Sequence, residues 1–213
     1  MTSNKPLITA LAVNPQKPDH RDLFVDGEFY ATLPLELTAQ QDLYVGAPFG
    51  EEEAEALLLA AQLVPAKEKA YQYLAYGDLS RKRLYEKLTR FGIEPQVADA
   101  ACDKMEEQGF IDDDRLARRL AARYAQSKLW GPRRILTEMI QKGIPAPLAQ
   151  EATEALETDF EESVLAHLAG KYRNRNLSDP KEVQKVIQGL LRLGFDYETI
   201  RNGLHRAAED FDD

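Results

Sequence analysis

The chain has 213 residues, of which 44% are hydrophobic, and a formal net charge of −9 at pH 7. This length suits one large domain or two small ones, and the apolar content can supply a core. There is no run of eighteen apolar residues, and the first residues lack the apolar stretch of a signal peptide, so we expect neither a membrane span nor export. The one cysteine, Cys102, has no partner for an internal disulfide, and we expect it to be buried in a helix in a reducing cytoplasm.

Charge is unevenly distributed along the chain. The net charge is −7 over residues 1–65, −2 over 66–115, +3 over 116–158 and −3 over 159–213. An acidic protein ordinarily avoids nucleic acid, because contacts to phosphate need lysine and arginine. Only the segment 116–158 has a net positive charge. A series of lysines and arginines begins just before it, at Arg115, and continues to Arg134. No acidic residue interrupts the series Arg115, Arg118, Arg119, Arg123, Lys128, Arg133 and Arg134.

The first third of the chain has the pattern of a small β structure. An apolar run from Leu7 to Val13 predicts a strand, and Asp26-Gly27 separates two runs rich in aromatic residues. Asp-Gly favours the positive φ angles of a type I′ turn, so we predict a hairpin over 23–30. Helices are predicted at 35–40 and 51–63, with glutamates in the first turn of the second.

Pro65 is predicted to end this N-terminal part, and the remaining chain has a helical pattern with a repeat. Gly92, Gly143 and Gly194 are each 51 residues apart, and each closes an apolar-periodic segment. Flanking apolar residues also recur at this interval, in the columns Leu84, Ile135 and Val186; Leu88, Met139 and Leu190; and Ile93, Ile144 and Phe195. We interpret these matches as three copies of one unit, at 66–115, 116–158 and 159–213.

Each copy is predicted to contain three helices. The second helix begins after a capping residue, which is Ser80, Gly131 or Asp179, and it ends at the repeated glycine. The third helix begins after Pro95, Pro145 or Asp196. The distance from cap to glycine is 15 residues in the third copy and 12 in the others, so its second helix should be about one turn longer.

These elements predict a mainly α protein. We expect three tandem three-helix repeats in an elongated, curved array, preceded by a small N-terminal domain that contains the β-hairpin. Such an array offers a long surface and no deep pocket. It therefore suits binding to an extended polymer better than turnover of a small molecule.

Several segments of the chain resemble the RecX family of regulatory proteins. The resemblance is clearest in 109–117, 131–135, 141–144 and 79–88, and the hairpin segment is similar to an N-terminal extension found in some members. It implies a small regulator that binds RecA on single-stranded DNA, lowers ATP hydrolysis and strand exchange, and limits filament growth. This chain is less basic than many members, and Leu116 stands where an aromatic residue is usual.

The cationic series is the candidate binding site for RecA or for DNA phosphates. The plainer alternative is a solvated helix face, but Arg118, Arg119 and Arg123 lack the acidic residue at i+4 that often accompanies such a face. Arg133 and Arg134 follow a helix start, where they oppose the helix dipole and where a bound anion would be favourable. A second candidate cluster lies in the first repeat and comprises Arg81, Lys82, Arg83 and Lys87.

Other conspicuous residues have structural interpretations. The run 112–114 of three aspartates is predicted to cap a helix rather than to bind a metal, because neighbouring helical residues point in different directions. Trp130 can stack on a base, but we favour a role in packing against the first turn of the following helix. His20, His167 and His205 lie in separate regions without a nucleophile nearby.

We therefore expect no catalytic residues, no cofactor and no bound metal, and a monomer whose partner is the RecA filament, with single-stranded DNA as a possible direct contact. The main alternative is a helix-turn-helix transcription regulator. That function needs base-edge donors on a recognition helix, and the segment 145–156 has neither lysine nor arginine.

Overall fold

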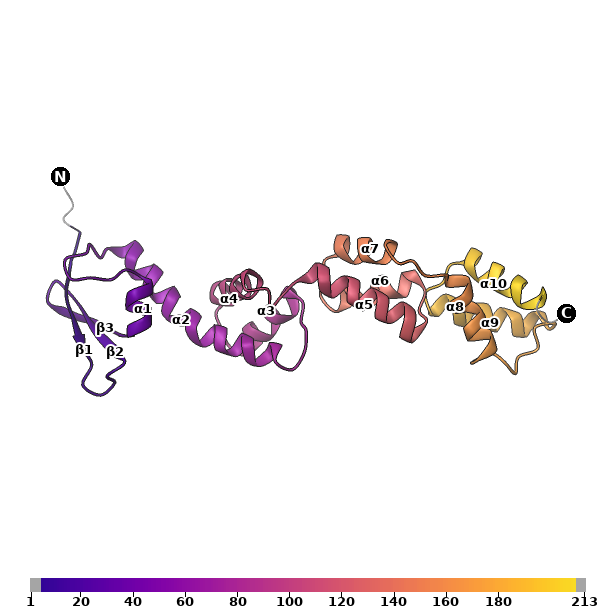
Figure 1. Ribbon diagram of the computed structural model, residues 1–213, viewed down its shortest axis with the longest axis horizontal. Coiled ribbons are helices and arrows are strands. Elements are labelled where there is room, and N and C mark those ends of the chain that lie inside the picture. The colour runs from indigo at the N-terminus through magenta and orange to yellow at the C-terminus, as the bar shows by residue number, and fades with distance from the viewer. Residues whose placement is uncertain (1–4, 210–213) are drawn as a thin grey trace. The chain divides into compact units, whose positions relative to one another are not determined.

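The computed structural model describes residues 5–209 and divides into two compact units (Figure 1). One unit comprises the chain up to Tyr73 together with Leu88–Met105, and the other comprises Leu74–Lys87 and the chain from Glu106 onward. The division of the sequence into four segments remains a prediction. The elements are β1 (Ile8–Val13), β2 (His20–Val25), β3 (Glu28–Pro34), α1 (Leu35–Gln40), α2 (Glu51–Leu74), α3 (Arg81–Arg90), α4 (Pro95–Glu107), α5 (Asp113–Lys128), α6 (Pro132–Gln141), α7 (Ala146–Glu154), α8 (Phe160–Ala169), α9 (Pro180–Arg192) and α10 (Tyr197–Glu209).

The three strands form an antiparallel sheet in the order β1-β2-β3. Asp26 and Gly27 join β2 to β3 with φ angles of 51° and 86°, as a type I′ turn requires, so the predicted hairpin is confirmed. The short helix α1 packs beside β3 (Figure 1). A compact apolar cluster fills this region, and its buried members are Ile8, Leu23, Leu33, Leu37, Ala47, Phe49 and Leu57.

Helix α2 runs through Pro65 without a break, so the helix predicted at 51–63 continues to Leu74 and the predicted helix end before Pro65 is wrong. A proline inside a helix removes one backbone hydrogen bond and crowds the preceding turn. Here residues on both sides of Pro65 are buried: Leu57 belongs to the cluster around the sheet, while Ala66 and Ala70 are 1% and 0% exposed. Burial of both halves of the helix offsets the local cost of the proline. A prediction based on helix-breaking residues alone does not take this burial into account.

The repeated second helices α3, α6 and α9 confirm the register of the sequence. The columns Leu84, Ile135 and Val186, and Leu88, Met139 and Leu190, are all fully buried. The three glycines that follow these helices have positive φ angles between 86° and 101°, which the absence of a Cβ atom permits. Helix α9 has 13 residues against 10 in α3 and α6, as the longer cap-to-glycine distance predicted.

The Ser80 side chain joins the start of α3 to the end of α6. The Ser80 hydroxyl donates a 2.8 Å hydrogen bond to the Lys142 carbonyl, and it also accepts one from the Arg83 amide at 3.2 Å. A Cβ on Gly143 would lie 2.6 Å from Ser80 Oγ. Glycine is therefore required at residue 143 both by its φ angle and by the close approach of Ser80.

A backbone junction joins the end of α9 to the start of α6. The Gly131 amide donates to the Leu193 carbonyl at 2.8 Å, and the Arg133 amide donates to the Gly194 carbonyl at 3.2 Å. A Cβ on Gly131 would lie 2.3 Å from the Gly194 carbonyl carbon. The carbonyl end of α9 thus satisfies amides at the start of α6, and the opposite helix-dipole ends meet.

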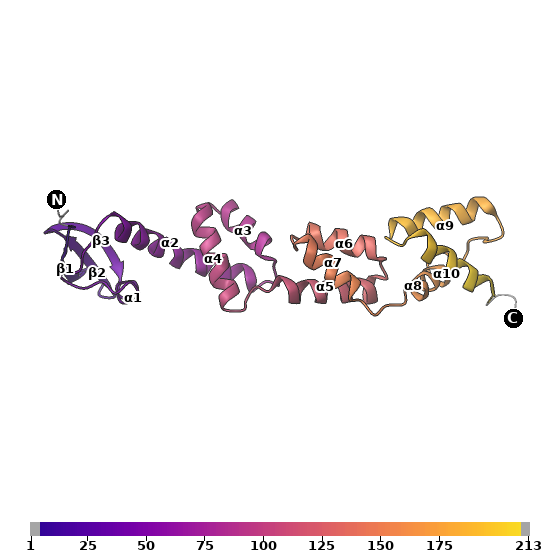
Figure 2. The same cartoon turned by 90° about the horizontal axis from the view of Figure 1, so that it is seen from above.

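The third repeat brings α10 against both α8 and α9 (Figure 2). Two glycines allow the close contacts: a Cβ on Gly203 would lie 2.6 Å from a methyl carbon of Val164, and one on Gly189 would lie 2.0 Å from the Tyr172 hydroxyl.

This repeat also contains a hollow of about 920 Å³, although the sequence predicted a surface without a deep pocket. Between residues 5 and 209, no helix is long and apolar enough to span a membrane.

Candidate functional site

The start of α5 is held by the aspartates that precede and open it. Asp112 is the N-cap, and its carboxylate accepts a 2.8 Å hydrogen bond from the Arg115 amide. Asp113 accepts a 3.0 Å hydrogen bond from the Arg81 amide, so it caps α3 from another helix. Burial raises the pKa of Asp113 above its ordinary value. The capping prediction is confirmed for Asp112. Within residues 5–209, no group of three or more acidic, histidine or cysteine side chains is placed to hold a metal.

Exposed arginines line one face of α5. Arg115, Arg119 and Arg123 are spaced by four residues and therefore lie on the same side of the helix. Arg115 donates to the Gly109 carbonyl at 3.1 Å, and its Nε lies 3.9 Å from an Asp112 carboxylate oxygen. All three side chains are solvent-exposed, so this face presents positive charge outward.

Arg118 and Arg119 have acidic partners that the sequence did not predict. Arg118 forms a 2.9 Å ion pair with Asp114, one turn before it on α5. Arg119 forms an ion pair with Asp78, which precedes α3. No acidic residue follows these arginines at i+4, as the sequence shows. The partner of Arg118 instead lies four residues before it, and the partner of Arg119 is 41 residues away in sequence and is brought close by folding.

Three exposed cations of the second repeat form no ion pair with any residue in the range 5–209. They are Arg123, Lys128 and Arg133. Because no carboxylate in this range forms an ion pair with them, their charges are the most available of the cationic series for an external anion. Arg133 is, however, one of the charges that lower the pKa of Asp196.

Arg134 differs from its neighbour Arg133 because its side chain is half-buried and contacts other side chains. Its guanidinium carbon lies 4.1 Å from the centre of the Trp130 ring, and its Nε lies 3.7 Å from a Glu138 carboxylate oxygen. A Cβ on Gly194 would lie 2.3 Å from the Arg134 amide nitrogen. Arg134 is therefore part of the packing at the repeat junction.

The first turn of α6 is already neutralised from within the chain. Its amides donate to the carbonyls at the end of α9, so the expectation that a bound anion would relieve this helix end does not hold. The electrostatic cost of two arginines there is met by the opposing dipole of α9.

Trp130 packs inside its own repeat. It lies against the cluster that contains Leu116, Ile135 and Met139, and its ring centroid is 4.8 Å from that of Tyr124. Together with its contact to Arg134 in the first turn of α6, this burial confirms the packing interpretation of Trp130. Leu116 is only 8% exposed in the same cluster.

The first-repeat cluster is partly engaged in holding the repeats together. Arg81 Nε forms a 3.1 Å ion pair with Glu106. Arg83 pairs with Glu86 at 2.7 Å and donates to the Gln141 carbonyl at the end of α6. Lys82 and Lys87 are exposed. Arg83 thus places positive charge at a helix C-terminus, where it is favourable.

The histidines occupy unrelated positions in the fold. His20 Nδ1 lies 2.9 Å from the Asp19 carboxylate, next to the sheet. His167 Nε2 lies 2.8 Å from the Leu129 carbonyl and its ring packs edge-on to Phe195. Neither of these contacts involves a nucleophilic side chain.

Three models of the RecX family match the chain in order. The first three-helix domain of RecX matches residues 66–105, the second matches 112–152 and the third matches 157–204. Together they span more than half of the chain and include the cationic series.

Relatives and solved structures agree with this match. The regulatory protein RecX of Clostridioides difficile is 28% identical over 202 residues, covering 94% of this chain and 95% of the relative. That of Caldanaerobacter subterraneus is 25% identical over 200 residues, covering 93% and 98%. A crystal structure of regulatory protein RecX has a TM-score of 0.66 at 23% identity, over 92% of this chain and 99% of that one. A RecX structure from Lactobacillus salivarius has a TM-score of 0.61 at 24% identity, over 69% and 97%. The chain belongs to the RecX family of regulatory proteins.

Proposed function

We propose that this protein binds RecA filaments on single-stranded DNA and inhibits RecA ATP hydrolysis, filament growth and strand exchange, and so modulates recombination and DNA repair. Membership of a regulatory family supports a regulatory role. The observation on which the proposal chiefly depends is the exposed cationic face of the second repeat, in a chain whose overall charge is negative.

The proposed contact surface consists of the cationic side chains of the second repeat and the adjoining start of α3. Arg123, Lys128 and Arg133 are exposed and free of ion pairs within residues 5–209, so we place them at its centre. Arg115, Arg118 and Arg119 extend it, and their exposed ion pairs are weak enough to exchange for a phosphate or a partner's carboxylate. The target is a DNA backbone or an acidic face of the filament, with no cofactor and no catalytic step.

The helix-turn-helix alternative is less well supported by the third helix of the second repeat. Helix α7 has no lysine or arginine, and the amide of Gln150 is bonded to Glu154 at 2.8 Å. A recognition helix needs free donors that can reach base edges. The cations instead lie on α5 and α6, which suits contact along a filament.

The test is to titrate the protein into RecA on single-stranded DNA and to measure ATP hydrolysis. We expect inhibition at substoichiometric protein, because one molecule at a growing filament end can block many additions. Arg123→Glu should weaken it, whereas Arg201→Glu, the same charge change at an exposed site on α10, should not. Unaltered hydrolysis at equimolar protein would contradict the proposal, and sequence-specific binding to a promoter duplex would favour the transcription regulator.

A further inference from the structure

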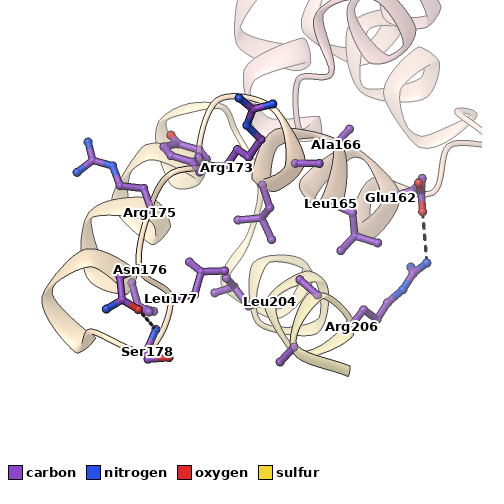
Figure 3. Close-up of a pocket in the computed structure, with 16 residues that line it drawn as sticks. Glu162, Leu165, Ala166, Arg173, Arg175, Asn176, Leu177, Ser178, Leu204 and Arg206 are labelled. Carbon is purple, nitrogen blue, oxygen red and sulfur yellow. Dashed lines mark hydrogen bonds and ion pairs between the residues drawn. The ribbon is translucent and has the colours of Figure 1, made fainter. Parts of the chain in front are cut away.

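The hollow of the third repeat lies between α8, α10 and the segment that joins α8 to α9 (Figure 3). Its volume of about 920 Å³ is within the range of about 300–1,000 Å³ usual for binding pockets. None of the cationic residues assigned to the filament surface lines it. Aliphatic side chains from all three sides form its walls, namely Leu165, Leu168, Leu177, Val183 and Leu204.

Local contacts hold the loop side of the hollow in place. The Tyr172 hydroxyl packs on Gly189, where any side chain would collide with it. The Asn176 side chain accepts a 2.9 Å hydrogen bond from the Ser178 amide, and Arg175 forms a 2.6 Å ion pair with Glu182 (Figure 3 shows the first of these). The loop that bounds the hollow is therefore fastened to α9, and the hollow is formed before any ligand binds.

The rim of the hollow has opposite charges on its two sides. On the loop side, Arg173 forms no ion pair within residues 5–209, and Glu182 is shared between Arg175 and Lys185. This side therefore has a net positive charge. On the other side, Arg206 of α10 lies 3.3–3.4 Å from three carboxylates at the start of α8, those of Asp159, Glu161 and Glu162. Arg206 and Glu162 line the hollow and the other two carboxylates lie beside them, so the group has a net negative charge.

We propose that this hollow is a docking site for a short peptide segment of a partner protein, with an aromatic or large aliphatic anchor and carboxylates next to it on one side. The anchor enters the apolar hollow, and the carboxylates meet Arg173 and Arg175 at the loop side. The other side of the rim repels additional acid and so fixes the direction of the peptide. This site is separate from the filament surface proposed above.

The test uses a fluorescein-labelled hexapeptide with blocked ends, Asp-Asp-Phe-Leu-Gly-Ser, titrated with the full chain and followed by fluorescence anisotropy. We expect saturable binding at low salt. Arg173→Glu should weaken it by about three- to tenfold, because one exposed pair is lost and one repulsion is added. Arg201→Glu, an equal charge change elsewhere in the repeat, should leave it unaltered.

A second variant tests the hollow itself. Ala166→Trp places a large side chain at an exposed wall position of α8, where it should fill the space without disturbing a buried residue. It should abolish peptide binding while the circular dichroism spectrum and the melting temperature stay unchanged. The proposal is overturned if the peptide fails to saturate, if Arg173→Glu and Arg201→Glu bind equally well, or if replacing both aspartates by lysines improves binding. RecA inhibition is measured on the same variants and should persist, which separates this site from the proposed function.

Discussion

Gly131 and Gly194 meet backbone to backbone: a Cβ on Gly131 would lie 2.3 Å from the Gly194 carbonyl carbon. The residues 51 positions earlier, Ser80 and Gly143, are also in close contact, but there the Ser80 hydroxyl makes it. The residue that starts one second helix therefore contacts the glycine that ends the next second helix along the chain.

The three equivalent glycines should differ in their tolerance of alanine. All have positive φ angles, and so each substitution costs about 1–2 kcal/mol of unfolding free energy from backbone strain. Among described atoms, a Cβ on Gly92 has no neighbour within 4 Å, one on Gly143 meets Ser80 Oγ at 2.6 Å, and one on Gly194 meets the Arg134 amide nitrogen at 2.3 Å. Urea unfolding of the full chain should rank the loss of stability in that order.

Gly92→Ala is the matched control, because it has the same conformational cost without the junction. The additional loss at Gly194 should be about 1–3 kcal/mol, which is typical of overpacking. Equal losses at Gly92 and Gly194 would show that the junction does not contribute to stability.

Ser80→Ala should lower stability by about 1–2 kcal/mol. Ser80 is 1% exposed, and its hydroxyl both donates to the Lys142 carbonyl and accepts from the Arg83 amide. The substitution removes a helix cap and leaves a carbonyl at the junction without its donor. Ser178→Ala, at an exposed position, is the control. A variant as stable as the wild type in urea unfolding would mean that water replaces the hydroxyl at no cost.

Arg134 and Arg133 should respond differently to alanine. Arg134→Ala removes the contact with Trp130 and the ion pair with Glu138, and should cost about 1 kcal/mol. Arg133→Ala removes an exposed side chain without an ion pair in the described range and should stay within about 0.5 kcal/mol of the wild type. The chain has one tryptophan, so its emission reports directly on Arg134. An unshifted emission maximum in Arg134→Ala would exclude the stacking contact in solution.

Asp196 should make stability depend on acid pH. Its carboxylate accepts a 2.8 Å hydrogen bond from the Thr199 amide at the start of α10, and chiefly this bond lowers the pKa of Asp196 below its ordinary value of 3.8. A lowered folded-state pKa gives stabilisation that is complete above the ordinary value and is lost as pH falls through the lowered one. Asp196→Ala should cost about 1 kcal/mol at pH 7.

The measurement is urea unfolding of the wild type and of Asp196→Ala between pH 7 and pH 2. The difference in unfolding free energy between the wild type and Asp196→Ala should shrink toward low pH, where protonation of Asp196 removes the favourable charge at the start of α10. A difference that stays constant over this range would mean that the charged form of Asp196 has no special role.

The sequence predicted those parts of the fold that depend on neighbouring residues. The caps at Asp112 and Asp179 and the terminating glycines act within one turn of a helix, so their residue types alone locate the helix ends. The Asp26-Gly27 turn is equally local. The helix through Pro65 was missed because burial on both sides outweighs a local breaker.

The candidate site was predictable in position and much less so in detail. The sequence located the cationic series. It did not show that Arg119 forms an ion pair with Asp78, or that Arg134 packs on the Trp130 ring and against Gly194. These contacts exist only after repeats have stacked. Ser80 and Gly143 had each been assigned a local role, and nothing in either local pattern indicated that they touch.

The additional turn of α9 lies at its N-terminal end, because Val186, Leu190 and Gly194 keep the 51-residue register at its C-terminal end. An insertion or deletion in the carbonyl half of a second helix would rotate the last carbonyls away from their donors and separate the repeats. The opposite end has no such restriction, and Val183 in its first turn lines the hollow. Changes of length can therefore accumulate there and reshape a binding cavity while the stacking of the repeats stays the same.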